Sequence, residues 1–259
     1  MSTQVAVLGR GRAWDQEVAF GRHLLHHPVD DEGGLVTRLT PGAHTLVLAE
    51  QRDALVLRRI CAGVAVSGDA PPVAGLALPH GPLALTVLGA LATASPASPA
   101  CLLTWLDGVA RSVWSAAWLQ TVSGVEDPSP SLGQHVRSWL PGGKGFLLEH
   151  APVSRVTRVR DGRSAAPSGP VPEGAETLPM AALSIARQRS AGQHLLAEAS
   201  AAHPRYGTSV VELATQPDPL PPRPQEAGLP SCPVCGIPLP REVCPYCRAR
   251  VAPAAQEVP

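Results

Sequence analysis

The sequence predicts an α+β fold in which a core domain rich in β-meander precedes a proline-rich linker and a small C-terminal zinc ribbon. Three observations predict this architecture. Between residues 35 and 66, short leucine-rich and β-branched runs alternate with Pro-Gly and charged turns, as in an antiparallel meander. Residues 217–230 contain six prolines, and residues 231–248 hold four of the six cysteines.

These composition changes divide the chain into four parts. We expect a core domain at residues 1–216, a proline-rich linker at 217–230, a zinc ribbon at 231–251 and a disordered tail at 252–259. Because a polyproline segment extends by ~3.1 Å per residue, the ribbon is expected as a separate module about 40 Å from the core at full stretch. The core and the ribbon are then expected to unfold independently.

The cysteine pattern of the ribbon predicts a metal site. Two Cys-x-x-Cys pairs eight residues apart suit one tetrahedral ion, and two disulfides or free thiols are the alternatives. Four thiolates leave no open position for water, so the site is expected to be structural, holding one zinc ion, with iron as the main competitor. The predicted ligands are Cys232, Cys235, Cys244 and Cys247.

Each cysteine pair is expected to form a tight knuckle. Gly236 follows the first pair and can adopt the positive φ that points backbone amides at the sulfurs. Arg248 occupies the equivalent place after the second pair, so that knuckle is expected to be less regular.

The core elements are predicted from hydrophobic periodicity. Trp14, Val18 and Leu25 fall at helical spacing, and residues 71–99 have no assignment. Helices are predicted at residues 102–121, 132–140 and 179–202, and strands at residues 4–8, 35–40, 44–49, 54–60, 64–66, 146–149, 153–160 and 209–214.

Several other motifs have two interpretations, and we favour the structural one for each. Gly9-Arg10-Gly11-Arg12 lacks the spacing of a phosphate loop and predicts a turn. His23, His26 and His27 have no patterned carboxylate or cysteine nearby, so a solvated edge is favoured over a metal site. Lys144, among glycines, is expected at a hairpin tip rather than on a phosphate.

The isolated aromatic residues and cysteines are also interpreted as structural. Trp114 and Trp118 lie four residues apart and share one face of the predicted helix, where core packing is favoured over ligand stacking. Cys61 is expected as a small buried hydrophobe, and with Cys101 it fits a reducing cytoplasm.

The composition limits the function. The 21 basic and 21 acidic residues cancel, which argues against broad electrostatic binding to nucleic acid. No secretory signal is evident. The apolar run at residues 73–94 is broken by Pro79, His80 and Pro82, so it is predicted to be core rather than a membrane span. Since no nucleophile, base and orienting group combine in a known motif, no enzyme activity is predicted.

Three segments resemble the stomatin–prohibitin–flotillin (band 7) superfamily, in particular its soluble branch with a terminal zinc ribbon, often labelled virion core proteins. Residues 24–66 are similar to its opening meander, with His27-Pro28, two strands and an Ala62-Gly63 step, and residues 195–213 are similar to its late helix and closing strand. The cysteine ribbon matches the ending of that branch. The resemblance implies an oligomerising or membrane-associated scaffold without catalysis, and extended structure near residues 22–27.

The sequence therefore predicts a cytoplasmic scaffold or adaptor that self-associates or docks a protein partner, with peripheral membrane association as one mode. The alternative is a nucleic-acid-associated factor whose ribbon contacts DNA or RNA. Arg241, Arg248, Arg250 and Tyr246 favour this alternative, whereas Glu242 and the absence of a basic tract weaken it.

Overall fold

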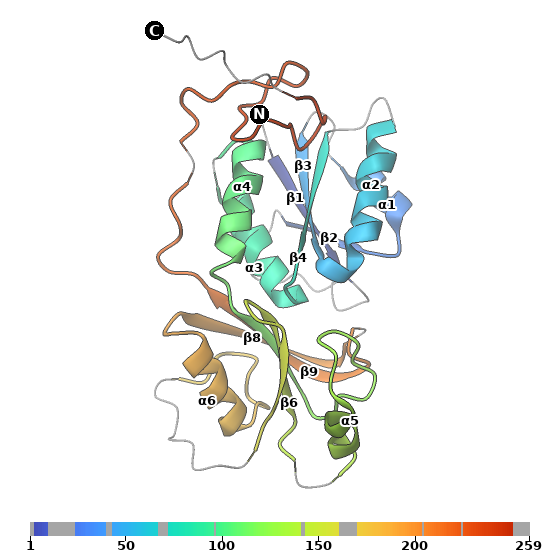
Figure 1. Ribbon diagram of the computed structural model, residues 1–259, viewed down its shortest axis with the longest axis vertical. Coiled ribbons are helices and arrows are strands. Elements are labelled where there is room, and N and C mark those ends of the chain that lie inside the picture. Colours follow the sequence, from blue (N-terminus) through green and yellow to red (C-terminus); the bar gives the residue numbers. More distant parts are fainter. Residues whose placement is uncertain are drawn as a thin grey trace.

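The structure of the protein is a computed structural model. It describes residues 3–9, 24–39, 43–66, 72–95, 97–140, 143–160, 170–203, 205–223 and 225–250. These residues form a four-stranded parallel sheet with helices on both faces and a five-stranded antiparallel sheet beside it (Figure 1). No helix in these ranges has the length and apolar character that a membrane crossing requires.

The parallel sheet has the strand order β2-β1-β3-β4. Its strands are β1 (Thr3–Gly9), β2 (Leu24–Pro28), β3 (His44–Glu50) and β4 (Val73–Leu78). Alternate side chains face opposite sides, so Val5 and Val7 pack with α3 (Pro82–Thr93) and α4 (Pro99–Ala110). Ala6 and Leu8 pack on the other side, in the cluster that includes α1 (Glu32–Arg38) and α2 (Ala54–Val66).

The antiparallel sheet has the order β7-β6-β5-β9-β8. Its strands are β5 (Ser115–Leu119), β6 (Phe146–Ala151), β7 (Arg155–Arg158), β8 (His194–His203) and β9 (Thr208–Gln216). Helix α6 (Met180–Arg189) covers one face and packs on Trp118, Leu147 and Leu213. Helix α5 (Leu132–Ser138) lies beside β7, where Gln134 Nε2 donates to the Val156 carbonyl at 2.9 Å.

The two sheets meet where α3 packs against β9. Glu212 of β9 is buried at this contact and accepts a hydrogen bond from the Leu83 amide, 2.9 Å away, in the first turn of α3. A carboxyl group fits this position because the first amides of a helix have no partner within the helix. The contact therefore fixes α3, and with it the parallel sheet, on the antiparallel sheet.

The predicted meander is wrong. Of its expected strands only residues 44–49 form one, as β3, and it pairs in parallel rather than antiparallel fashion. Residues 35–38 belong to α1, and residues 54–66 form α2. Leu57, Ile60 and Val64 supply the buried stripe of α2 at helical spacing, which the apolar run obscured.

Two long predicted helices are also wrong, because each is a shorter helix followed by a strand. Residues 102–121 split into the end of α4 and β5, and residues 179–202 split into α6 and β8. The unassigned residues 71–99 contain β4 and α3, whose side chains are core, as predicted for residues 73–94.

The remaining predictions divide into confirmed elements and untested ones. Strands at residues 4–8, 146–149, 153–160 and 209–214 and the short helix at 132–140 are confirmed within a few residues as β1, β6, β7, β9 and α5. Trp14, Val18, His23 and the turn at residues 10–12 lie outside the described residues, as does the tail at 252–259.

Candidate metal centre and buried polar seam

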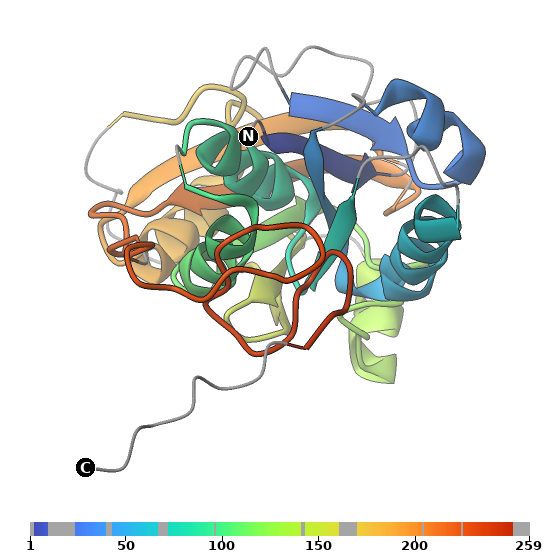
Figure 2. The same ribbon diagram turned by 90° about the horizontal axis from the view of Figure 1, so that it is seen from above.

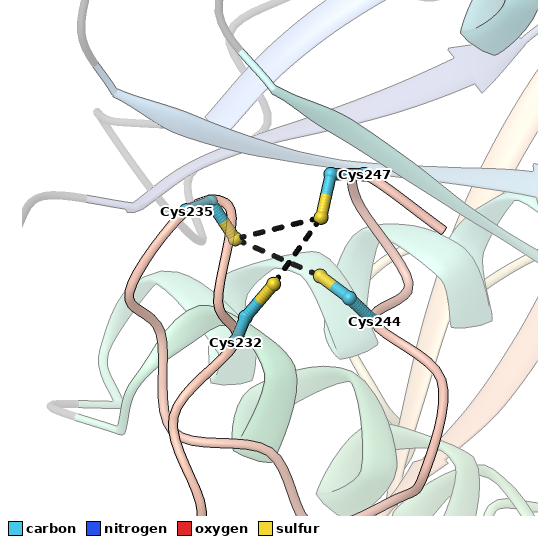
Figure 3. Close-up of side chains that lie close together, drawn as sticks. All are labelled: Cys232, Cys235, Cys244 and Cys247. Atoms are coloured by element: carbon cyan, nitrogen blue, oxygen red, sulfur yellow. Dashed lines mark hydrogen bonds between the residues drawn. The ribbon is translucent and has the colours of Figure 1, made fainter. Parts of the chain in front are cut away.

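The four cysteines of the ribbon converge on one point (Figure 3). All four sulfurs lie within 4.8 Å of one another, and the closest pairs are 3.3, 3.7 and 3.9 Å apart. A tetrahedral zinc ion with Zn–S bonds of about 2.3 Å separates its sulfurs by about 3.8 Å. The cluster therefore fits a four-thiolate metal ion, and its sulfurs are too far apart for disulfides. The ligand set is Cys232, Cys235, Cys244 and Cys247.

The two knuckles have the same backbone geometry. Gly236 has φ +70° and donates its amide to the Cys232 carbonyl at 2.9 Å, while Arg248 has φ +61° and donates to the Cys244 carbonyl at 3.0 Å. The expectation that the second knuckle is less regular is wrong. Arg248 adopts the left-handed conformation although its side chain makes that conformation costly, by about 1–2 kcal/mol.

Backbone amides polarise the first ligand. Burial raises the pKa of the Cys232 thiol, but the amides of Cys235 and Val234 and the neighbouring thiols outweigh it and lower that pKa to about 6. A lowered thiol pKa favours the thiolate that binds metal. In the same cluster burial and the neighbouring thiols raise the pKa values of Cys235 and Cys247, so all four thiols ionise together only when a cation balances their charge.

The ribbon packs directly on the parallel sheet. Ile237 and Leu239 are buried in the same apolar cluster as α3, α4 and strands β1 and β3. The Tyr246 ring meets the His44 ring edge-on at 5.1 Å, at the first residue of β3. Figure 2 shows the ribbon over α4 and beside β4, on the side of the sheet away from β2. The ribbon therefore packs against α4 and the amino end of β3.

The linker follows the surface of α4, along the side of the molecule in Figure 1. The Trp105 indole donates to the Pro221 carbonyl at 2.9 Å, and the Arg223 guanidinium lies 5.7 Å from the Trp105 ring centre. Glu226 accepts from the Ser98 amide at 2.6 Å, at the N-cap of α4. The prediction of a separate, distant ribbon is therefore wrong, because the linker makes hydrogen bonds to α4 and the ribbon packs in the apolar cluster of the core.

The carboxyl ends of the parallel strands, where ligands of such sheets usually bind, are closed by a buried polar seam. We use this name for Glu50, His150, Arg205, Tyr206 and Glu212, all of which are buried. Glu50, the last residue of β3, forms an ion pair with Arg205, the first described residue after β8. The antiparallel sheet thus occupies the place of a ligand.

Hydrogen bonds in the seam run in one direction. Arg205 donates to His150 Nδ1 at 3.3 Å, so His150 Nε2 carries the proton and donates to the Tyr206 hydroxyl at 3.0 Å. Tyr206 donates to Glu212 at 3.4 Å. Burial raises the pKa of the Glu212 carboxyl to about 8, and burial together with Arg205 keeps the pKa of His150 well below its usual value. Both groups are therefore neutral at pH 7.

A serine–histidine pair lies next to the seam. His80 Nδ1 is 2.9 Å from the Ser115 hydroxyl, and His80 Nε2 donates to the Ala110 carbonyl at 2.9 Å. Burial lowers the pKa of His80 to about 4. Ser115 is only 1% exposed, and the pair joins the start of β5 to the end of α4. The Ser115 hydroxyl is buried, while His80 lines a cavity of about 310 Å³ together with Asp107 and Arg111.

The other predicted residues have structural positions. Trp114 and Trp118 pack in the core under α6, as the structural interpretation required, but from β5 and the residue before it rather than from a helix. Lys144 is exposed just before β6. His27 is buried, with Nε2 2.5 Å from the Asp31 carbonyl, so the solvated edge is wrong for this residue.

Sequence reasoning missed the seam. The sequence feature that could have identified the seam is a carboxylate within an apolar run or directly after one. Glu212 lies within the run SVVELA, and Glu50 directly follows the run HTLVLA. Such a residue is either an edge of the core or a buried group with a partner. The partner Arg205 lies 155 positions from Glu50 and cannot be identified from spacing.

No protein-family model, curated protein or solved structure matches this chain. The resemblance to the band 7 superfamily depended on consecutive strands at residues 35–40, 44–49 and 54–60, of which the first and third are helical. We therefore assign no family. The four-cysteine cluster at the C-terminus is the part of that comparison which the structure retains.

Proposed function

We propose that this protein is a non-enzymatic scaffold or adaptor that self-associates through the apolar face of α5 and carries one structural zinc ion in its ribbon. The observation that carries the proposal is the exposure of four apolar side chains around this short helix. Their exposed fractions are 81% for Leu132, 51% for Val136, 76% for Trp139 and 57% for Leu140.

The spacing of these residues makes them one surface. Leu132 and Val136 lie four residues apart on one face of α5, and Trp139 and Leu140 follow directly after its last residue. The helix is held in place, since Ser131 and Gln134 form a capping box and Gln134 also bonds the β7 backbone. Exposed apolar patches of this kind mark interaction surfaces.

A second copy of the chain is an occupant that the overall charge permits. The whole chain has a formal net charge of zero, so two copies have no long-range repulsion, and Arg137 is the one charged residue of α5 (LGQHVRS) besides the titratable His135. An apolar helix face can pack against its own symmetry mate in an isologous contact. Figure 1 places α5 at the end of the molecule opposite to the ribbon, which leaves the ribbon free for another partner.

The absence of catalysis in this proposal is supported by the state of the titratable groups. The seam residues are buried and bond one another, and the Ser115 hydroxyl beside His80 is buried. Four thiolates complete the zinc shell, so the metal would stabilise the ribbon rather than activate water. The proposed scaffold function therefore depends on the exposed surfaces of the protein rather than on a catalytic site.

Light scattering coupled to size-exclusion chromatography at micromolar concentration tests the proposal. The full-length protein is expected to be a dimer or larger, and the double variant Leu132→Glu/Trp139→Glu is expected to be monomeric with an unchanged far-UV spectrum. Leu55→Glu is the matched control, because Leu55 is 71% exposed on α2 and far from this face in sequence. A monomeric wild type refutes self-association, and flotation of the wild type with lipid vesicles assigns the face to a membrane surface instead.

The second candidate is the nucleic-acid-associated factor. Arg241, Arg248 and Arg250 are exposed on the ribbon, which favours contact with a polyanion. Arg241 lies 3.7 Å from Asp107 and next to Glu242, which reduces the positive potential there. A mobility shift of a DNA or RNA probe at physiological salt distinguishes this candidate from the scaffold.

A further inference from the structure

We infer that the free edge of β4 binds an acidic, extended peptide segment of a partner protein, which adds to the parallel sheet as a further strand. The inference deepens the adaptor function proposed above by giving the chemical class of the partner. It depends on an unpaired sheet edge, on two cavities beside that edge, and on the arginines that line them.

Strand β4 is the last strand of the parallel sheet. The Thr45 amide donates to the Pro72 carbonyl at 2.9 Å, and Thr45 pairs with Val73 in the register of the two strands. In a parallel ladder this directs the backbone groups of even-numbered β4 residues toward β3. The amides and carbonyls of Val73, Gly75 and Ala77 therefore point away from the sheet. In the described part of the chain these groups have no backbone partner.

The edge is also accessible. Gly75, Leu76 and Ala77 are partly exposed in the middle of the strand, although the strand itself is apolar (VAGLAL). An unprotected apolar edge is a template for strand pairing, and natural proteins usually cover or charge such an edge. Addition of a peptide strand to an open edge is a common mode of peptide recognition.

Two cavities flank this edge on the two faces of the sheet. The first, of about 590 Å³, lies between α2, β4 and the ribbon and is lined in part by Arg58, Cys61 and Tyr246. The second, of about 580 Å³, lies between α4, β4 and the ribbon and is lined in part by Leu103 and Arg241. Both cavities reach Gly75 and Arg248.

This arrangement matches an added strand. Successive side chains of a strand point to opposite faces of its sheet. A peptide beside β4 would therefore place alternate side chains in the two cavities while its backbone bonds the outward groups of β4. Cavities for side chains together with backbone pairing give such a site both affinity and selectivity.

The charges select an acidic peptide. Arg58 and Arg248 line the first cavity, and no carboxylate is among its lining residues. Arg241 and Arg248 line the second cavity, where Glu242 is the acidic neighbour. Arg241 lies 3.7 Å from Asp107, so the excess of arginine is at the first cavity, and aspartate or glutamate at the peptide positions that face this cavity meets a complementary charge.

Arg248 provides an independent argument. A glycine at this position would form the same knuckle without strain, as Gly236 does in the first knuckle. Instead the chain keeps an arginine at φ +61°, and its side chain reaches both cavities. Residues in strained backbone conformations cluster at functional sites, which makes the Arg248 side chain a candidate contact for the peptide.

The test uses the full-length zinc-loaded protein and an array of octapeptides that combine valine with glutamate or lysine at each position. Glutamate-containing peptides are expected to bind, and the affinity of the best one is then measured by fluorescence polarisation against its lysine counterpart, expected to bind at least about tenfold more weakly. Absence of binding by any acidic peptide, or equal binding by lysine peptides, overturns the inference.

Three variants locate the site. Arg248→Gly removes the side chain while it preserves the knuckle, and Arg58→Glu reverses a charge in the first cavity; each is expected to weaken binding at least about tenfold. Ala77→Pro removes one of the outward amides that would bond the peptide, so it is also expected to weaken binding. It breaks no bond to β3, and proline is tolerated on edge strands. Arg59→Glu is the matched control, because Arg59 neighbours Arg58 on α2 but does not line either cavity.

Two further outcomes contradict the inference. Competition by a 20-nucleotide single strand that depends on Arg248 would assign the arginines to nucleic acid. Binding that appears only in a variant ending at Arg250 would show that the C-terminal residues of the chain itself occupy the edge. The Leu132→Glu/Trp139→Glu variant is expected to bind the peptide normally, so failure of self-association and failure of this inference are distinguishable.

Discussion

Gly236 and Arg248 occupy equivalent positions in two knuckles that have the same backbone hydrogen bonds. A comparison of the two positions therefore gives the free energy that a side chain costs in the left-handed region. A Cβ built on Gly236 meets no atom within 4 Å, which leaves backbone strain as the cost of Gly236→Ala. We expect this change to destabilise the ribbon by about 1 kcal/mol and Arg248→Gly to stabilise it by up to a similar amount. Competition for zinc with a chelator measures both. Equal effects of the same sign would contradict the equivalence of the two knuckles.

Glu212 gives the protein a pH dependence that its neutral composition conceals. Its pKa is raised to about 8 in the folded protein, against 4.5 in the unfolded chain, so the folded state binds more protons and its stability falls as pH rises between these values. His80 acts in the opposite direction. Its pKa is lowered from 6.5 to about 4, so the stability it contributes above pH 6.5 is lost as pH falls toward 4.

Glu212→Gln tests the first effect, because the amide oxygen can still accept from Leu83 while no proton is released. We expect this variant to gain stability relative to the wild type as pH rises from 5 to 9, by on the order of a few kcal/mol at the alkaline end. Chemical denaturation at several pH values measures it. Glu173→Gln, at an exposed carboxylate between β7 and α6, is a control of the same chemistry. Parallel pH profiles for wild type and Glu212→Gln would contradict the assignment.

Helices and strands whose apolar residues repeat with one clear period were predictable from sequence. Those in uniformly apolar sequence or in sequence rich in small residues were not. Strands β1, β6 and β9 were found because their apolar runs are short and bounded by turn residues. Trp114 and Trp118 misled because a spacing of four places residues on one face of a strand as well as of a helix. Local pattern did not distinguish these cases.

Helix α2 shows the same limitation in the opposite direction. Its sequence ALVLRRICAGVAV has leucines and valines at alternating as well as helical positions, and the parallel sheet decides between them. A parallel sheet needs a crossover between β3 and β4, and α2 provides it. The four-cysteine cluster was predictable from sequence because its members lie within sixteen residues. The seam was not, because its partners come from β3, β6 and β9 and meet only after folding.

For the whole molecule, the four-cysteine ribbon is part of the core rather than an appendage. Ile237, Leu239 and Tyr246 are buried against the parallel sheet, and each buried apolar side chain contributes about 1.5–3 kcal/mol. The linker adds the Glu226 bond to the N-cap of α4 and the contacts of Trp105. Loss of the metal should therefore affect the stability of both sheets.

We predict one zinc ion per purified chain and a lower melting temperature for the core when it is lost. Cys232→Ser/Cys244→Ser is expected to contain no zinc and to melt at least about 5 °C lower, since 1 kcal/mol corresponds to about 2–4 °C for a chain of this size. Far-UV circular dichroism reports the core, because the ribbon contains only isolated bridges. Cys61→Ser, outside the cluster, is the control and should keep both zinc and melting temperature. Retention of zinc by the double variant would refute the ligand set, and an unchanged melting temperature would show that core and ribbon unfold independently despite their contacts.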